Sequence, residues 1–309
     1  MNIGLVGVGR WGKNITKTLL SFKDIELCCV TSSNNNIYDY VPKECCIYKR
    51  WEEMLNHQNL DGIIVSTPPH THYEIAKSSL LKGIPVLVEK PLTLDSKEAL
   101  SLKKISFKKN ILIMNEFTQV FNPKFVALKK SLRLIGEIRE IHTKACNFGP
   151  IRTNVPVLWD WGSHELSIVI SLLNQTPEFI KANKTKQENN NLGEASSWKI
   201  VCNFKNNVTS SSEISNISAK ERSISVIGSK GIIVLDDLSK DPLKFYKDKK
   251  TIDLWNETGN TIRITNKRTP LYEALLNFFN CIRKKEMNHW SLNLGVQVTE
   301  LLEQCSKDY

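Results

Sequence analysis

The sequence predicts an α/β protein of two domains: first a doubly wound parallel sheet, then an α+β domain with an open-faced mixed, mostly antiparallel sheet. The apolar run 1–6 is followed directly by a segment with three glycines, residues 7–12. Strand-like and helix-like segments then alternate through residues 1–117, which is the βαβ pattern of a parallel sheet. Over residues 118–309 short alternating segments instead follow one another with few helices, as in an antiparallel sheet with one open face.

Hydrophobic periodicity and turn residues give the elements of the first domain in order. Ile15, Leu19 and Leu20 place one buried face on a helix at 13–20, and Gly83 ends a helix at 72–81. The expected strands are 1–6, 25–30, 46–48, 61–66, 85–88 and 111–114, and the other helices are 51–55 and 96–104.

In the second domain, apolar residues that recur at every second position predict six strands. These strands are 138–146, 179–184, 198–204, 208–214, 223–227 and 232–235. Helices are expected at 123–132, 164–173, 270–284 and 291–305, the last of them capped by Ser291.

Composition and charge bound the class of protein. The 309 residues are 41% hydrophobic and 24% charged, which is typical of a globular chain of about two domains. No apolar run approaches the roughly 18 residues that span a bilayer, so we expect no membrane segment and a cytoplasmic location. The net charge of +10 comes from scattered lysines without a nucleic-acid-binding motif. We therefore expect no nucleic-acid partner, although the positive field favours ligands that carry phosphate.

The eight cysteines include two adjacent pairs, Cys28-Cys29 and Cys45-Cys46, but no C-x-x-C motif. Most of them lie in apolar segments, which is typical of buried, reduced thiols that pack as small hydrophobic side chains. A zinc site built from the two pairs is not expected, because adjacent cysteines suit tetrahedral ligation poorly. The sequence therefore predicts no metal.

The segment Gly7-Val8-Gly9-Arg10-Trp11-Gly12 has the G-x-G-x-x-G pattern between a strand and a helix. In a Rossmann domain the first glycine permits the tight turn, the second lets the backbone approach a pyrophosphate, and the third lets the helix pack on the strand. The start of that helix offers N–H groups to the phosphates. The pattern predicts a dinucleotide site at Gly7, Gly9, Arg10, Trp11 and Gly12.

The end of the second strand normally carries the residue that meets the adenosine ribose, about 20 residues beyond the glycine turn. That position is Ser32 here. An acidic residue there would repel a 2′-phosphate, and none is present, while Arg10 is a candidate to approach that phosphate. The cofactor is accordingly NAD or NADP, with a slight lean to NADP.

Two further segments carry residues suited to proton transfer. Lys90 follows the strand at 85–88, where open α/β sheets bind ligands, and there a lysine can hydrogen-bond a hydroxyl. A surface Glu–Lys pair beside a turn proline is the alternative. Asp160 and His164 are four residues apart, so they share one face of a helix. A helix-capping Asp160 with a core histidine is the alternative for this pair.

The order of these segments resembles the Gfo/Idh/MocA (glucose–fructose oxidoreductase/inositol dehydrogenase) family along essentially the whole chain. The matching segments are GVGRWG at 7–12, residues 66–93, FNP at 121–123, and residues 147–168 and 223–237. The closest likeness is to members that act on sugars and nucleotide sugars in surface-polysaccharide pathways. The resemblance implies an NAD(P)-dependent sugar dehydrogenase or ketoreductase that forms a homodimer or homotetramer through the open sheet face.

The resemblance also implies roles for individual residues. Lys90 would position the reacting hydroxyl or carbonyl, His164 would be the general acid/base, and Asp160 would orient it or bind substrate. The Lys90–Pro91 bond is expected to be cis. Two groups of lining residues follow: Thr67, Pro68, His72 and Glu89 beside the nicotinamide, and Asn147, Arg152 and Trp159 beside the substrate.

Three positions depart from the pattern of the family. Ser32 replaces the usual acidic residue after the second strand, Ser167 replaces a second aspartate, and Val120 replaces an arginine. These departures keep a second interpretation open, in which the chain binds a dinucleotide or a sugar without turning it over. The presence of Lys90, Asp160 and His164 favours the enzyme.

Overall fold

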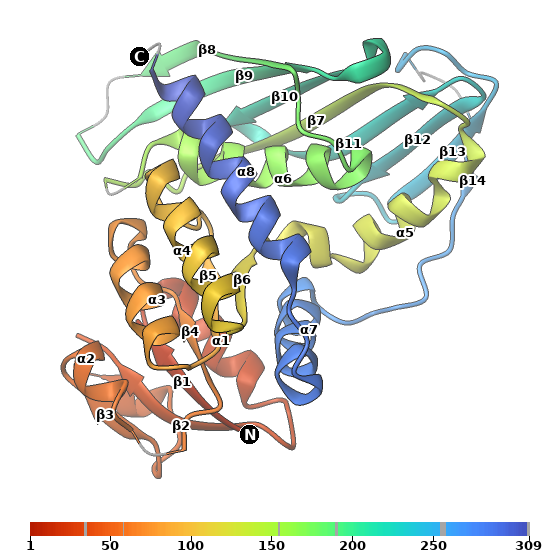
Figure 1. Cartoon of the computed structure of the whole chain (residues 1–309). Helices are drawn as coiled ribbons and strands as arrows, with labels where there is room; N and C mark the ends of the chain where they lie inside the picture. Colours follow the sequence, from red (N-terminus) through yellow and green to blue (C-terminus); the bar gives the residue numbers. More distant parts are fainter. Residues whose placement is uncertain (34–35, 58, 154, 189–190, 254–257, 308–309) are drawn as a thin grey trace. The chain divides into compact units, whose positions relative to one another are not determined.

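A computed structural model describes residues 1–33, 36–57, 59–153, 155–188, 191–253 and 258–307 of the chain (Figure 1). The chain divides into two compact units. The first comprises Met1–Phe117 and Leu271–Glu300, and the second comprises Thr118–Pro270 and Leu301–Tyr309. The first boundary between the units follows residue 117. Residues 271–300 also belong to the first unit, although they are distant from residues 1–117 in the sequence.

The first unit contains a six-stranded parallel sheet in the order β3-β2-β1-β4-β5-β6. Its strands are β1 (Asn2–Val6), β2 (Glu26–Thr31), β3 (Cys46–Tyr48), β4 (Gly62–Val65), β5 (Val86–Glu89) and β6 (Ile113–Glu116). The predicted doubly wound parallel sheet is thereby confirmed. Strand order reverses between β1 and β4, and in such sheets ligands bind beyond the carboxyl ends of the strands at that reversal.

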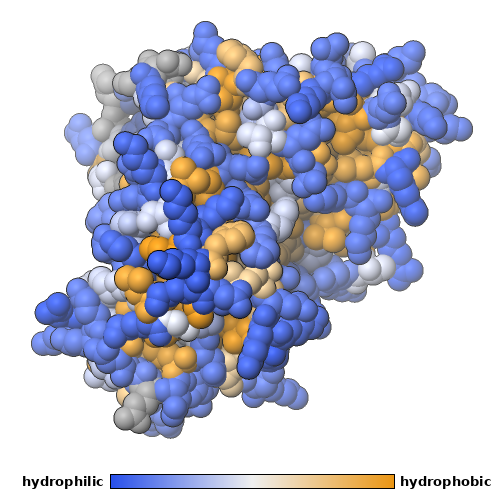
Figure 2. All heavy atoms as spheres, viewed as in Figure 1, coloured by the Kyte–Doolittle hydropathy of each residue, from blue (hydrophilic) through white to orange (hydrophobic). Residues whose placement is uncertain are grey.

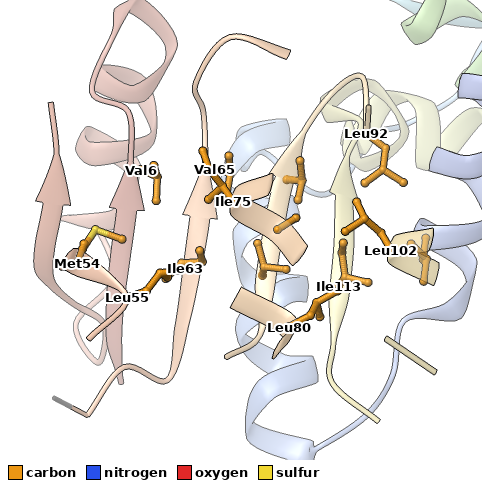
Figure 3. Packing of buried hydrophobic residues seen from close by; sticks show 14 of the residues in the cluster. Val6, Met54, Leu55, Ile63, Val65, Ile75, Leu80, Leu92, Leu102 and Ile113 are labelled. Atoms are coloured by element: carbon orange, nitrogen blue, oxygen red, sulfur yellow. The ribbon is translucent and has the colours of Figure 1, made fainter. Parts of the chain in front are cut away.

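Helices pack on this sheet to form the core of the first unit. They are α1 (Arg10–Leu19), α2 (Trp51–Met54), α3 (His72–Leu81), α4 (Ser96–Lys109), α7 (Pro270–Lys284) and the first part of α8 (His289–Ser306). Figure 3 shows Met54, Ile75 and Leu102 of three helices packed among the strand residues Ile63 and Ile113. Each such buried side chain contributes about 1.5–3 kcal/mol to folding.

The pairing of β1 with β2 contains a β-bulge at Cys28. Ile3 pairs with Leu27 and Gly4 pairs with Cys29, so Cys28 is one extra residue on β2. Gly4 leaves room opposite this bulge, because a Cβ at that position would lie 3.2 Å from the Cys29 sulfur. A bulge of this kind changes the direction of side chains along the strand.

Ser291 was expected to cap the last helix, and this prediction is wrong. Helix α8 begins at His289, and the side chain of Asn288 accepts a hydrogen bond from the Ser291 backbone N–H at 3.0 Å. The Ser291 hydroxyl instead donates to the carbonyl of Asn115 on β6 at 2.8 Å and accepts from the N–H of Asn115 at 3.0 Å. Ser291 therefore attaches α8 to the sheet of the first unit.

The second unit contains an eight-stranded sheet in the order β14-β13-β12-β11-β7-β10-β9-β8. Among its described strands only the neighbours β7 and β10 run parallel, which confirms the predicted mixed, mostly antiparallel sheet. The strands are β7 (Ile138–Phe148), β8 (Phe179–Glu188), β9 (Ala195–Asn203), β10 (Thr209–Ser215), β11 (Ile217–Gly228), β12 (Gly231–Asp236), β13 (Leu243–Lys247) and β14 (Asn260–Thr261).

In the described part of this unit, the α-helices that belong wholly to it are α5 (Pro123–Ser131) and α6 (Val157–Leu173). Helix α6 lies along one face of the sheet and is buried over most of its length (Figure 1). It begins at Val157, seven residues before the predicted start at 164, because Pro156 provides an extended N-cap. Asp160 and His164 therefore both lie inside this helix.

Short 3₁₀ turns connect several elements, at Ile37–Asp39, Pro69–Thr71, Thr118–Phe121, Leu132–Leu134 and Lys205–Asn207. No helix in the described parts of the chain combines the length and apolar character needed to cross a membrane. Hydrophilic side chains cover much of the visible surface, and hydrophobic ones form small groups between them (Figure 2).

Candidate functional site

The glycine turn after β1 has the geometry that its sequence pattern predicts. Gly7 has a φ of +93°, a conformation that glycine adopts without strain. Its N–H donates to the carbonyl of Thr31 at 3.0 Å, and its carbonyl accepts from the Ser66 hydroxyl at 2.6 Å. A Cβ on Gly12 would lie 2.2 Å from the Gly7 carbonyl oxygen, so only glycine allows α1 to start this close to the turn.

Gly9 forms the N-cap of α1, and its side faces open space. Apart from its own chain neighbours, no heavy atom of the described residues lies within 4 Å of the position that a Cβ would take, and no side-chain hydrogen bond caps the helix there. Backbone N–H groups at an uncapped helix start, with the positive end of the helix dipole, suit a phosphate group. These residues therefore fit the pyrophosphate of a dinucleotide.

A pocket of about 600 Å³ lies beside this turn. Its lining contains the predicted residues Gly7, Gly9, Arg10, Ser32, Thr67 and Pro68. Three cationic residues that the sequence interpretation missed, Lys13, Lys49 and Arg50, line it as well. Lys49 and Arg50 directly follow β3, and β3 pairs with β2, so they lie beside the strand that ends near Ser32. The sequence signal that could have identified Lys49 and Arg50 is their position directly after the predicted strand at 46–48.

Trp11 of the glycine motif contacts Glu89 at the end of β5. The indole Nε1–H of Trp11 donates to the Glu89 carboxylate. Glu89 is buried and pairs in register with Glu116 on β6. Burial, followed by the charge of Glu116, raises the pKa of Glu89 well above its ordinary value.

Lys90 follows β5 directly and is half-buried, and the Lys90–Pro91 bond is cis as expected. His72 is fully buried beneath the loops that carry Lys90 and Thr67. Its Nδ1 lies 2.9 Å from the Pro91 carbonyl oxygen, and its Nε2 lies 2.9 Å from that of Thr67. Burial lowers the pKa of His72, although both carbonyls oppose that change. His72 thus connects two loops at the carboxyl end of the sheet.

In the second unit, Asp160 and His164 are one turn apart near the start of α6, so they project from one face of the helix. The Nε of Arg152 lies 2.9 Å from a carboxylate oxygen of Asp160. The Asp160 side chain is only 12% exposed, whereas that of Arg152 is 46% exposed. Arg152 therefore orients the Asp160 carboxylate, and the Arg152 guanidinium itself stays accessible to an anionic ligand.

The other predicted substrate-side residues lie in the same unit. Trp159 is buried on α6, and its indole N–H donates to the Ser306 hydroxyl at 2.9 Å. Asn147 is half-buried near the end of β7. Glu165, which follows His164, was not among the predicted residues and is buried. Burial raises the pKa of the Glu165 carboxyl, and the charge of Arg222 opposes that change.

Known families match both parts of the chain. Residues 1–117 match the Gfo/Idh/MocA oxidoreductase family model of the NAD-binding Rossmann fold, and residues 134–308 match that of its C-terminal α/β domain. Among curated relatives, the NADP-dependent scyllo-inositol 2-dehydrogenase IolW of Bacillus subtilis strain 168 is 24% identical over 203 residues. That match covers 62% of this chain and 56% of IolW, so the chain spans little more than half of that relative.

Solved structures agree over almost the whole length. A protein of Magnetospirillum magnetotacticum MS-1, provisionally described as an oxidoreductase, is 32% identical with a TM-score of 0.92, and 99% of each chain is covered. UDP-N-acetylglucosamine 3-dehydrogenase GnnA of Acidithiobacillus ferrooxidans is 19% identical with a TM-score of 0.83, and 99% of this chain and 96% of that chain are covered. At that identity the second likeness concerns the fold alone. The two family matches, on a fold with the glycine turn of a dinucleotide site, show that the chain belongs to the Gfo/Idh/MocA family of oxidoreductases.

Proposed function

We propose that the protein is an NAD(P)-dependent oxidoreductase acting on a secondary hydroxyl or ketone carbon of a sugar or nucleotide sugar, in sugar or surface-polysaccharide metabolism. The observation that carries the proposal is the Asp160–His164 pair on α6, with Asp160 held by Arg152, in a chain that also contains a dinucleotide-type pocket. The curated relative IolW is named as a scyllo-inositol dehydrogenase, which supports a polyol or sugar as the substrate class.

Each residue has a stated task in this proposal. His164 takes the proton from the substrate hydroxyl in oxidation and returns it in reduction, since an imidazole suits proton transfer near neutral pH. Lys90 positions the reacting hydroxyl or carbonyl by a hydrogen bond, and Asp160 orients His164 or a substrate hydroxyl. The nicotinamide, when bound, supplies the acceptor or donor of the hydride.

Substrate binding falls to the remaining residues of the second unit in this proposal. Arg152 holds an anionic group of the substrate, for which its bidentate guanidinium is suited. Asn147 and Trp159 complete the lining. Residues 1–117 would then bind the cofactor, and residues 118–309 would bind substrate and form the oligomer.

The same proposal prefers NADP over NAD. Arg10, Lys13, Lys49 and Arg50 line the pocket that also contains Ser32, and among the described residues Glu52 is the one acidic residue that lines it. Glu52 is itself engaged by Arg50 at 3.5 Å. This excess of positive charge favours the additional 2′-phosphate of NADP.

We further propose that the enzyme is cytoplasmic and forms a homodimer or homotetramer through the sheet face that α6 does not cover. Charged residues on that face, with Lys144 at 3.1 Å from Glu221 and 3.9 Å from Glu213, offer polar contacts to a second copy. Sedimentation analysis of the purified chain, with Lys144→Glu as the variant, tests this part. A monomer in the wild-type protein would contradict it.

Two experiments test the activity. A thermal-shift screen of nucleotide sugars with NAD and NADP in parallel ranks ligands, because stabilisation grows with ligand concentration over the dissociation constant. With the best pair, Lys90→Ala and His164→Ala should each lower turnover by about 100-fold or more. Both should leave cofactor binding nearly unchanged.

Lys97→Ala and His289→Ala serve as matched controls, since Lys97 is an exposed residue at the start of α4 and His289 is an exposed residue at the start of α8. Full activity in the Lys90 and His164 variants would refute the assigned roles. Cofactor binding without any change in nicotinamide absorbance, over the whole sugar panel, would favour the non-catalytic interpretation instead.

A further inference from the structure

The first unit contains a group of three potential metal ligands outside the dinucleotide pocket. The sulfur atoms of Cys28 and Cys29 and a ring nitrogen of His57 all lie within 4.8 Å of one another. The two sulfur atoms are 3.8 Å apart. Cys28 and Cys29 are buried, and His57 is half-buried at the end of the turn that follows α2.

The β-bulge explains how two adjacent cysteines serve one site. In a regular strand, successive side chains point to opposite faces, so neighbouring thiols could not converge. Here Cys28 is the extra residue between the pairs Ile3–Leu27 and Gly4–Cys29. The objection that adjacent cysteines suit tetrahedral ligation poorly therefore does not apply at this position.

We propose that Cys28, Cys29 and His57 bind one Zn²⁺ ion, with water as the fourth ligand. A tetrahedral zinc ion with Zn–S distances of about 2.3 Å holds two thiolates about 3.8 Å apart, which matches the observed separation of the sulfur atoms. Two thiolates and a neutral imidazole cancel the charge of a divalent ion, so the occupied site carries no net charge into the core. A monovalent thiophilic ion would leave one negative charge buried, which is costly.

The residues around the three ligands are of the kinds that surround metal ions in proteins. The hydroxyl of Tyr48 lies 2.9 Å from Nδ1 of His57, and such a second contact fixes the orientation of a ligating ring. Met54, Leu55 and Ile63, which lie close together in Figure 3, belong to the same buried hydrophobic cluster as the two cysteines.

The metal would join elements that also line the dinucleotide pocket. Cys28 and Cys29 lie on β2, which leads to Thr31 and Ser32 of the pocket, and His57 follows α2, whose residues Trp51 and Glu52 line it too. The proposed ion is therefore structural. It connects β2 to the segment that follows α2, and it takes no part in hydride transfer.

Zinc binding by the reduced, metal-free full chain tests the proposal, measured by competition with a chromophoric chelator. We expect one Zn²⁺ per chain. Cys28→Ser and His57→Gln should each weaken binding more than about 100-fold, and Tyr48→Phe by about tenfold, since loss of an outer contact costs 10–100-fold. Cys202→Ser, which changes a buried thiol on β9 of the second unit, should bind zinc like the wild type.

Cobalt provides an independent readout, because Co²⁺ in this site should show thiolate charge-transfer absorption that Zn²⁺ abolishes. If Cys28→Ser fails to fold, the zinc affinity of His57→Gln tests the proposal instead. His57 is half-buried and lies outside helix and strand, so this substitution should leave the fold intact. Circular dichroism of each variant establishes that it is folded. Absence of zinc binding by the wild type, or equal binding by wild type and a folded His57→Gln variant, would overturn the proposal.

Discussion

The glycine turn permits a prediction that separates cofactor binding from folding. Gly9 and Gly12 lie three residues apart in one motif, yet alanine meets opposite surroundings at the two positions. At Gly9 the new methyl group finds open space, whereas at Gly12 it would lie 2.2 Å from a backbone oxygen. Gly9→Ala should therefore impair binding alone, and Gly12→Ala should impair stability.

The magnitudes follow from this geometry. Gly9 has φ −79° and ψ −159°, which alanine also adopts, so the stability of Gly9→Ala should stay within about 0.5 kcal/mol of wild type. Its methyl group occupies the space assigned to the pyrophosphate. Loss of one charge-assisted hydrogen bond, about 1.5–3 kcal/mol, weakens cofactor binding about 10- to 150-fold.

In Gly12→Ala the start of α1 must move by about 1 Å to relieve the contact, and such overpacking costs about 1–3 kcal/mol. For a unit of about 150 residues this lowers the melting temperature by about 3–10 °C. Differential scanning fluorimetry of the cofactor-free variants and isothermal titration with NADPH measure the two effects. A Gly9→Ala variant that binds NADPH like wild type, or a Gly12→Ala variant of unchanged stability, would refute the reasoning.

Three further predictions concern charged residues. Glu89 has a raised pKa in the folded protein, so the folded state keeps a proton that the unfolded chain releases, and stability is lost as pH rises from about 4.5 through the folded pKa. Glu89→Gln keeps an acceptor for Trp11 and should raise the melting temperature more at pH 8 than at pH 5; an equal change at both would contradict this. Arg50→Ala should weaken NADPH binding about fivefold and NADH binding little, because the exposed Arg50 gives a charged contact at the low end of its usual strength, whereas Lys23→Ala should alter neither affinity. Arg152→Ala should change stability by less than about 1 kcal/mol, as befits a half-exposed ion pair, but should raise the substrate KM about tenfold or more; an unchanged KM would remove Arg152 from substrate binding.

The elements that local pattern determines were predicted well. Helix α3 spans His72–Leu81 as expected, since its apolar period and the following Gly83 are both local signals. Helix α1 begins at Arg10 and not at residue 13, because the last residues of the glycine motif already form its first turn. Strand β13 was missed: Leu243–Lys247 is short and its residues are only partly buried beyond Leu243.

Features that depend on distant pairing could not be predicted from the sequence. Lys49 and Arg50 line the dinucleotide pocket only because β3 pairs with β2, and no local pattern reveals that neighbour. The bulge at Cys28 arises from the register of β1 against β2, so the convergence of two adjacent thiols was equally hidden. By contrast, the shared face of Asp160 and His164 follows from their spacing of four residues, because α6 begins at Val157 and contains both.

The return of residues 271–300 to the first unit has a consequence for biosynthesis. Phe22, near the end of α1, stacks on Tyr272 and meets Phe279 edge-on, and Asn115 bonds to Ser291, which lies 176 residues later. A ribosome that has delivered the glycine turn must therefore add more than half of the chain before the sheet can receive its last helices. Until then Phe22 lacks its aromatic partners, so the nascent unit exposes apolar surface of the kind that promotes aggregation during folding.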